Sequence, residues 1–265
     1  MTVTNPMTTA AVTVVTGCNK GMGLEIVKQL LDRKEEIGKV FGLCRRSSPA
    51  LDTLASNSDG KLVVLDNIDV SNDAVVKQLQ DYFGQQPIDV VIHNAGASGL
   101  PKKFADDGEF FASQSLANIT MENMRFTFEL NTLGPLRVTQ ALLPNLKNAA
   151  ASNRGHLTKV IIISSSGGSI ASVESGGLYS YRTSKAAVNM VGKNIAEDLK
   201  PDGIALGLIH PGTVDTGMLK TRTSFHRDVD VSVKGVLKAA DLVTLENTGS
   251  FVDANYGEGV KPLPW

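Results

Sequence analysis

The chain has 265 residues, of which 42% are hydrophobic, and its formal net charge at pH 7 is −1. This length and apolar content suffice for one large domain with a sizeable core. The near-neutral charge excludes the basic excess with which nucleic-acid-binding proteins neutralise phosphates, so no nucleic-acid partner is expected.

The N-terminal stretch 1–10 is rich in threonine and lacks both a basic leader and a continuous apolar run. We predict a flexible tail there rather than a secretory signal. No apolar run approaches the ~18 residues that cross a bilayer, so no membrane partner is expected. Cys18 and Cys44 lack the spacing of a zinc site or a disulfide framework, and the four histidines are too scattered to bind a metal. The expectation is a cytoplasmic protein without a metal.

Beyond residue 10, apolar β-rich runs alternate with segments that carry apolar residues at helical spacing. Strands are predicted at Ala11–Thr16, Val40–Cys44, Leu62–Leu65, Val90–His93, Lys159–Ser164, Ala205–Ile209 and Ser250–Val252. Helices are predicted at Leu24–Asp32, Ala74–Tyr82, Met121–Leu130 with a continuation through Leu146, Tyr181–Leu199 and Val233–Ala240. This order predicts a single α/β domain over 11–265, with a doubly wound parallel sheet of about seven strands and helices on both faces.

Three glycines, Gly17, Gly21 and Gly23, follow the first predicted strand and open the first predicted helix. Because glycine has no Cβ, such a turn lets the backbone approach a pyrophosphate, whose charge the free amides of the helix start stabilise. An ordinary strand-to-helix turn is the alternative. The position of the turn in the first βαβ unit favours a dinucleotide site.

The end of the second predicted strand carries Arg45 and Arg46 and no acidic residue. An NAD site needs an acid there for the ribose 2′-hydroxyl, whereas NADP brings a phosphate that favours Arg or Lys. Lys20, within the glycine turn, adds a further cation. Each of these charges alone also fits a solvated surface residue, but together they favour NADP(H).

Tyr181 and Lys185 are four residues apart on a predicted helix, so their side chains leave the same face. We expect the ammonium, together with an oxidised nicotinamide, to lower the tyrosine pKa and so tune it for proton transfer. Ser164, Ser165 and Ser166 lie at the end of the fifth predicted strand, where a hydroxyl can stabilise charge on a carbonyl oxygen.

Four motifs occur in the same order as in the short-chain dehydrogenase/reductase family, which the chain resembles from Val12 to about Thr216. They are T-G-x-x-x-G-x-G at 16–23, Asn94-Ala95-Gly96, Tyr181 with Lys185, and Pro211-Gly212. Arg182-Thr183-Ser184-Lys185 and the ending Phe251–Trp265 resemble the sniffer and C-factor branch of carbonyl reductases. The family implies a Rossmann-type fold.

The resemblance implies Asn131, Ser165, Tyr181 and Lys185 as catalytic residues, with Asn131 linked to the lysine through water. Ser165 lies sixteen residues before Tyr181, whereas most relatives have thirteen, so the intervening loop is three residues longer and Ser164 and Ser166 remain alternatives. The implied cofactor-binding residues are Gly17, Asn19, Lys20, Gly21, Met22, Gly23, Arg45, Asp69, Val70, Asn94, Ala95, Gly96, Tyr181, Lys185, Pro211, Gly212, Val214 and Thr216. His93 replaces the family's usual asparagine and is expected to be structural.

The resemblance therefore implies an NADPH-dependent reduction of an aldehyde, ketone or quinone, with Tyr181 as the general acid and a homodimer or homotetramer as the assembly. Ala97–Ala117 and Thr216–Val231 are expected to form the rim of the small-molecule substrate site, ordinary surface loops being the alternative. A protein of another class, which binds NADP(H) as a signalling or sensing ligand without turnover, is the second hypothesis.

Overall fold

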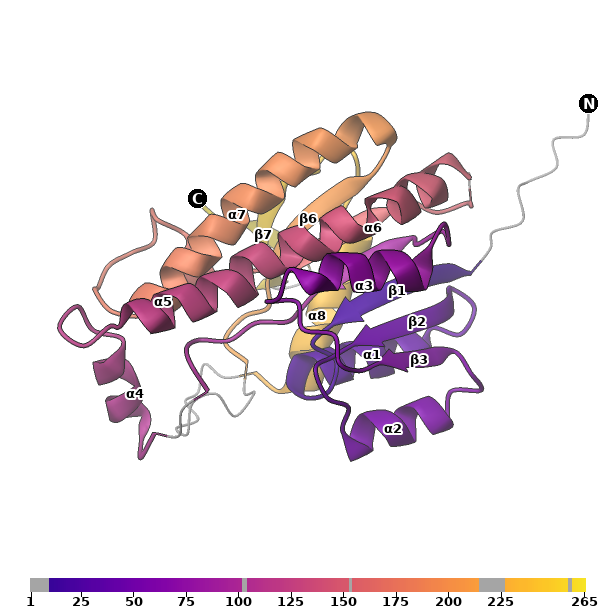
Figure 1. Ribbon diagram of the computed structural model, residues 1–265. Helices are drawn as coiled ribbons and strands as arrows, with labels where there is room; N and C mark the ends of the chain where they lie inside the picture. The colour runs from indigo at the N-terminus through magenta and orange to yellow at the C-terminus, as the bar shows by residue number, and fades with distance from the viewer. Residues whose placement is uncertain (1–9, 102–103, 153, 215–226, 257–258) are drawn as a thin grey trace, which may run out of the picture.

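The computed structural model describes residues 10–101, 104–152, 154–214, 227–256 and 259–265 (Figure 1). Within these ranges, eight strands form one sheet in the order β3-β2-β1-β4-β5-β6-β7-β8. The strands are β1 (Ala11–Thr16), β2 (Ile37–Leu43), β3 (Leu62–Leu65), β4 (Val90–His93), β5 (Lys159–Ile163), β6 (Ala205–His210), β7 (Ser250–Tyr256) and β8 (Gly259–Pro262). Neighbours from β3 through to β7 pair in parallel, and β8 pairs antiparallel to β7. The predicted doubly wound sheet is confirmed.

Helices cover both faces of the sheet (Figure 1). They are α1 (Gly21–Asp32), α2 (Pro49–Ser56), α3 (Ala74–Phe83), α4 (Asp107–Ser113), α5 (Met121–Phe128), α6 (Gly134–Ala151), α7 (Tyr179–Leu199) and α8 (Val229–Asp241). The helices α1 and α8 pack on one face, while α3, α6 and α7 contribute to the core of the other. No helix in the described part of the chain is both long and apolar enough to span a bilayer.

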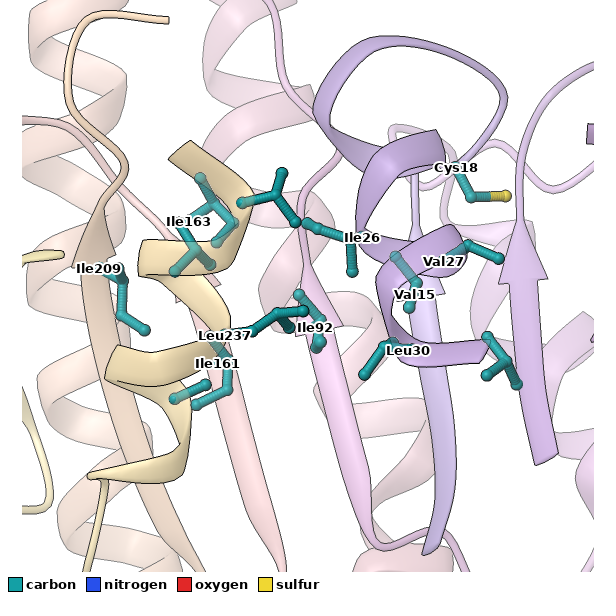
Figure 2. Packing of buried hydrophobic residues seen from close by; sticks show 14 of the residues in the cluster. Val15, Cys18, Ile26, Val27, Leu30, Ile92, Ile161, Ile163, Ile209 and Leu237 are labelled. Atoms are coloured by element: carbon teal, nitrogen blue, oxygen red, sulfur yellow. The ribbon is translucent and has the colours of Figure 1, made fainter. Parts of the chain in front are cut away.

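Two apolar cores lie on opposite sides of the sheet because successive strand residues point to opposite faces. Val15 and Ile161 pack into the core under α1 and α8, whereas Val14 and Val160 pack into the other core. Figure 2 shows Ile26, Leu30 and Leu237 pointing from the two helices onto the strands. Since both faces are covered, the central strands are mostly apolar on both sides.

The short helices α2 and α4 and the edge strand β8 were not predicted. Both helices begin at residues whose side chains accept a hydrogen bond from the first turn. The Ser48 hydroxyl accepts from Leu51 N at 3.2 Å, and the Asp106 carboxylate accepts from Glu109 N at 2.8 Å. Strand β8 contains Gly259 and Pro262 and lies on the sheet edge, where apolar alternation is not required.

The long helix predicted from Met121 to Leu146 is interrupted. Five residues, Glu129–Leu133, form a π-helix (η1) between α5 and α6, and Asn131 lies at its centre. Pro135 lies in the first turn of α6, where a missing N–H has little cost. The helix is therefore wider at Asn131, a distortion that occurs frequently at functional sites.

Candidate functional site

The glycine turn between β1 and α1 packs closely against the residues that follow β4. Gly17 has a φ of +69°, and a Cβ added there would lie 2.8 Å from Ala95 Cα. A Cβ on Gly23 would lie 2.1 Å from Gly17 O and 2.5 Å from Asn94 Nδ2. Only glycine fits at these two positions, and the rest of the predicted turn, Asn19, Lys20, Gly21 and Met22, connects them.

Asn94 and Ala95 are fixed to the end of β1 by hydrogen bonds. Both backbone N–H groups donate to Thr16 Oγ1 at 3.1 Å. The Asn94 side-chain amide donates to Thr16 O at 3.2 Å and to Gly17 O at 3.1 Å. Because the strand order reverses between β1 and β4, this contact marks the switch point where open α/β sheets bind ligands.

Gly23→Ala tests this packing. We expect the variant to lose about 1–3 kcal/mol of unfolding free energy or more, because the added methyl overlaps backbone and amide atoms that cannot easily move. Urea unfolding measures the loss. Gly259→Ala is the matched control, since an added Cβ there meets no atom within 4 Å. Equal stability of the two variants would contradict the close approach.

A hollow of about 570 Å³ lies beyond the ends of β1, β2 and β3 and is lined by Asn19, Arg45, Arg46, Asn67 and Asp69. Both arginines are exposed and follow β2, as predicted. The Asp69 carboxylate accepts hydrogen bonds from Ser71 N at 3.0 Å and Ser71 Oγ at 2.6 Å. The hollow therefore has a net positive lining, which suits a phosphate.

Two predicted residues lie near this hollow without lining it. Lys20 is exposed and immediately precedes α1. Val70 is buried in the core and faces Gly134 of α6.

Lys185 and Tyr181 lie one turn apart on α7 near the end of β5. The Lys185 Nζ atom donates to Ile163 O at 2.8 Å and lies 5.8 Å from the centre of the Tyr181 ring. A Cβ on Gly96 would lie 3.8 Å from Lys185 Nζ and 3.1 Å from Asn131 Oδ1. Residues from β5, α7, η1 and the segment after β4 thus converge.

Of the three consecutive serines, Ser165 lies beside Tyr181. A Cβ on Gly167 would lie 3.3 Å from Ser165 Oγ and 3.7 Å from Tyr181 Cε1. The Ser164 hydroxyl instead donates to Asn189 Oδ1 of α7 and is buried. Ser166 begins the short 3₁₀ turn η2 (Ser166–Gly168).

Burial shifts the pKa of both Tyr181 and Lys185. Burial raises the pKa of the Tyr181 phenol, and a hydrogen bond with Ser165 partly opposes that rise. The pKa of Lys185 is itself lowered to about 8 by burial. The lowering of the Tyr181 pKa expected from the sequence requires a bound oxidised nicotinamide as well as the Lys185 ammonium, and it stays a prediction for the cofactor-bound protein.

The low pKa of Lys185 predicts a pH-dependent stability. Below about pH 8 the folded protein bears a buried Lys185 ammonium. Between about pH 8 and 10.5 this lysine is protonated in the unfolded chain but mostly neutral in the folded protein, so the unfolding free energy rises with pH. The Lys185→Met variant has no titrating group at this position. Relative to it, the unfolding free energy of the wild type should rise by roughly 3 kcal/mol across this pH range. Denaturant unfolding from pH 7.5 to 10.5 measures this, with Lys193→Met on the same helix as the control. A difference that is constant with pH would contradict the prediction.

The side chain of Asn131 connects three segments. Its Oδ1 accepts from Ala97 N at 2.9 Å, and its Nδ2 donates to Ala97 O at 2.8 Å and to Ser184 Oγ at 2.9 Å. Sequence analysis did not identify Ala97 or Ser184 as partners, because their pairing depends on the tertiary packing of η1 against α7. Asn131 thereby fixes the chain immediately after Gly96.

The segment after β6 is described only in part. Gly212 has a φ of +82°, and Pro211 O accepts a hydrogen bond from Ser232 Oγ at 2.7 Å. Val214 forms an isolated bridge with Arg227. Thr216 lies outside the described residues, as do residues 1–9 of the predicted tail and most of the predicted rim 216–231.

His93 is buried, and its Nε2 lies 2.9 Å from Thr139 Oγ1. Burial lowers the pKa of His93 to about 3, so this side chain is neutral and hydrogen-bonded, consistent with the structural role predicted for it. In the described part of the chain, no three His, Cys, Asp or Glu side chains are grouped so that they could hold a metal ion.

Comparisons with known proteins agree with this arrangement. Residues 11–227 match the model of the short chain dehydrogenase family. C-signal of Myxococcus xanthus is 37% identical over 179 residues, 68% of this chain and 93% of that protein. The 1-hydroxy-2-glutathionyl-2-methyl-3-butene dehydrogenase of a Rhodococcus species is 32% identical over 242 residues, 90% of this chain and 94% of that protein.

Two solved structures are similar over nearly the whole length. The NADPH-bound carbonyl reductase from chicken fatty liver is 30% identical with a TM-score of 0.80, covering 97% of this chain and 99% of that one. The carbonyl reductase Sniffer of D. melanogaster is also 30% identical with a TM-score of 0.80, covering 97% of this chain and 100% of that one.

Proposed function

Because this chain belongs to the short-chain dehydrogenase family, we propose that it is an NADPH-dependent oxidoreductase that reduces the carbonyl group of a small molecule. Tyr181 is the general acid that protonates the carbonyl oxygen. The same residues serve alcohol oxidation when the reaction runs in reverse.

One observation carries the proposal: Ser165, Tyr181 and Lys185 converge at the ends of the central strands, next to the glycine turn. The Ser165 hydroxyl and the Tyr181 ring both lie within 4 Å of the position that a Cβ on Gly167 would occupy. The Lys185 amine lies on the Gly96 side of this group. A hydroxyl, a phenol and an amine within one cluster are suited to proton transfer at a carbonyl oxygen.

The residues of the cofactor site fit NADP(H). Gly17 and Gly23 lie where an added Cβ would collide with neighbouring atoms. With no side chain at these positions, the turn backbone stays accessible to a pyrophosphate. Arg45 and Arg46 in the adjoining hollow would hold a 2′-phosphate. The similarity to a carbonyl reductase crystallised with NADPH supports the same choice. When bound, NADPH supplies the hydride that reduces the carbonyl carbon.

Further cofactor contacts follow from the family motifs. Asn19, Lys20, Gly21 and Met22 would contact the phosphates, and Asp69 and Val70 the adenine. Asn94, Ala95 and Gly96 would adjoin the ribose, and Pro211, Gly212, Val214 and Thr216 would hold the carboxamide.

Each member of the catalytic cluster has a distinct role in this proposal. Tyr181 donates its phenolic proton to the carbonyl oxygen. The Ser165 hydroxyl donates a hydrogen bond to the same oxygen as negative charge develops on it. Lys185 stabilises the phenolate that remains. Asn131 holds the chain at Ala97 and the helix α7 in place beside the cluster through hydrogen bonds to Ala97 and Ser184.

A carbonyl panel tests the proposal. Purified protein is incubated with NADPH and aldehydes, ketones and quinones, and NADPH consumption is followed at 340 nm. Turnover of at least one class supports an enzyme. The similarity to C-signal favours one alternative, a signalling protein that binds NADP(H) without turnover. That alternative predicts NADPH binding by calorimetry with no consumption across the panel.

Exposed apolar side chains support self-association, as a homodimer or homotetramer. Met121 and Phe128 on α5, Leu136 on α6 and Met190 on α7 are all exposed, and α5 packs against α7. Such side chains on adjacent helices are typical of an interface between subunits. Analytical ultracentrifugation measures the mass, and a monomer at micromolar concentration would contradict this part of the proposal.

A further inference from the structure

A second hollow, of about 440 Å³, lies beside the first turn of α7 and away from the basic hollow. One wall comes from the end of α4 and the residues after it, Phe111, Ser115 and Leu116. The opposite wall comes from the segment that leads into α7 and from its first turn, including Ser175, Tyr179 and Arg182. None of these residues has a role in the cofactor site.

Arg182 is the single charged side chain that lines this hollow. Its guanidinium donates to the backbone carbonyl of Ser175, and it forms no ion pair with any carboxylate in the described part of the chain. The side chain is half-buried. A cation that is partly removed from water and has no carboxylate partner attracts an anion more strongly than an exposed arginine does.

The hollow adjoins the catalytic cluster through Arg182 itself. A Cβ added to Gly167 would lie 3.3 Å from Ser165 Oγ and 3.7 Å from Tyr181 Cε1. The same position is 3.7 Å from Arg182 Cγ. The stem of Arg182 thus begins beside the two hydroxyl-bearing residues, and its guanidinium faces the hollow. A substrate whose carbonyl meets Tyr181 can extend along this stem.

The character of the walls identifies the kind of group that fits. Phe111 and Leu116 are apolar and exposed, at 45% and 76%. Arg182 supplies hydrogen-bond donors, whereas the Ser115 hydroxyl already donates to Ala112 O at 2.8 Å. Apolar surface next to an arginine suits an organic carboxylate, whose hydrocarbon part packs while its oxygens accept the guanidinium N–H groups.

We propose that this hollow is the distal part of the substrate site and that Arg182 binds a carboxylate of the substrate. The inference rests on the proposed carbonyl reduction and names its substrate class, an aldehyde or ketone that carries a carboxylate at the end of an apolar chain. Arg182 is then a specificity-determining residue for the reaction.

A length series of ω-oxo carboxylic acids and their methyl esters tests the proposal. With NADPH and wild-type protein, one chain length should give an acid-to-ester ratio of kcat/KM of about ten or more, from a charge-assisted hydrogen bond. Arg182→Gln should lower that ratio about tenfold, and Arg182→Lys should keep part of it. Arg125→Gln, an exposed arginine on α5 outside the hollow, should leave the ratio unchanged. Equal ratios in wild type and Arg182→Gln would overturn the proposal.

Binding of heptanoate, measured by calorimetry with NADP⁺ present, tests the hollow without turnover. Heptanoate should bind the wild type and the Arg125→Gln variant but bind Arg182→Gln about tenfold more weakly. If no carbonyl compound is reduced, the proposed function is wrong. The heptanoate titration still shows in that case whether Arg182 binds a carboxylate. If neutral aldehydes are reduced with no acid preference and heptanoate binds both proteins equally, the anion site alone fails.

Discussion

Replacing Tyr181 by Phe should lower kcat for NADPH-linked carbonyl reduction by a factor on the order of 100 to 10,000, the usual contribution of a positioned general acid. The variant removes one oxygen and leaves the ring that packs beside Ser165 and Lys185. NADPH binding should persist, because the basic hollow and the glycine turn are untouched. The loss should therefore appear in kcat rather than in the dissociation constant of NADPH.

Steady-state kinetics with calorimetry of NADPH binding measure the two quantities separately. Tyr82→Phe is the matched control, since it deletes the same hydroxyl from a half-exposed tyrosine on α3. Its kcat should equal that of the wild type. Unchanged NADPH consumption by Tyr181→Phe would show that another group donates the proton.

Arg45→Asp should reverse the charge at the proposed 2′-phosphate position and weaken NADPH binding on the order of 100-fold, with little effect on NADH. NADPH loses a charge-assisted hydrogen bond and gains repulsion from a carboxylate, whereas the 2′-hydroxyl of NADH can donate to that carboxylate. Arg45 is exposed at the edge of its hollow, so the change should not disturb folding.

Dissociation constants for both nucleotides, measured at one ionic strength, give the change in selectivity. Arg125→Asp alters the net charge equally but lies on α5 outside the hollow, and its selectivity should match that of the wild type. Losses of equal size for NADPH and NADH in Arg45→Asp would refute the charge argument.

Much of the fold could be predicted because its signals are local. Val160–Ile163 is a buried apolar run, Gly17 and Gly23 fit a turn in which a Cβ would collide with backbone, and Tyr181 and Lys185 occupy one helix face. The two missed helices also carried local signals. Ser48 followed by Pro49, and Asp106 followed three residues later by Glu109, are typical helix starts.

Other features depend on contacts between distant segments. The hollow lined by Arg182 is built from residues near 111 and near 175, which no periodicity brings together. The partners of Asn131 lie on other elements, at Ala97 and Ser184. The pKa directions of Tyr181 and Lys185 follow from burial, which four-residue spacing does not reveal. The sequence therefore predicted the candidate side chains of the site more readily than their hydrogen-bond partners and their burial.

The measurement that tests the central claim most directly is isotope transfer. Wild-type protein is incubated with NADPH deuterated at C4 of the nicotinamide, in separate reactions for each C4 position, together with a carbonyl compound from the active class. Mass spectrometry of the alcohol should find deuterium on the former carbonyl carbon for one of the two labelled cofactors, and Tyr181→Phe should form this product far more slowly. Tight NADPH binding with no label in any alcohol from either cofactor would contradict the account and leave a nucleotide-binding protein without reductase activity.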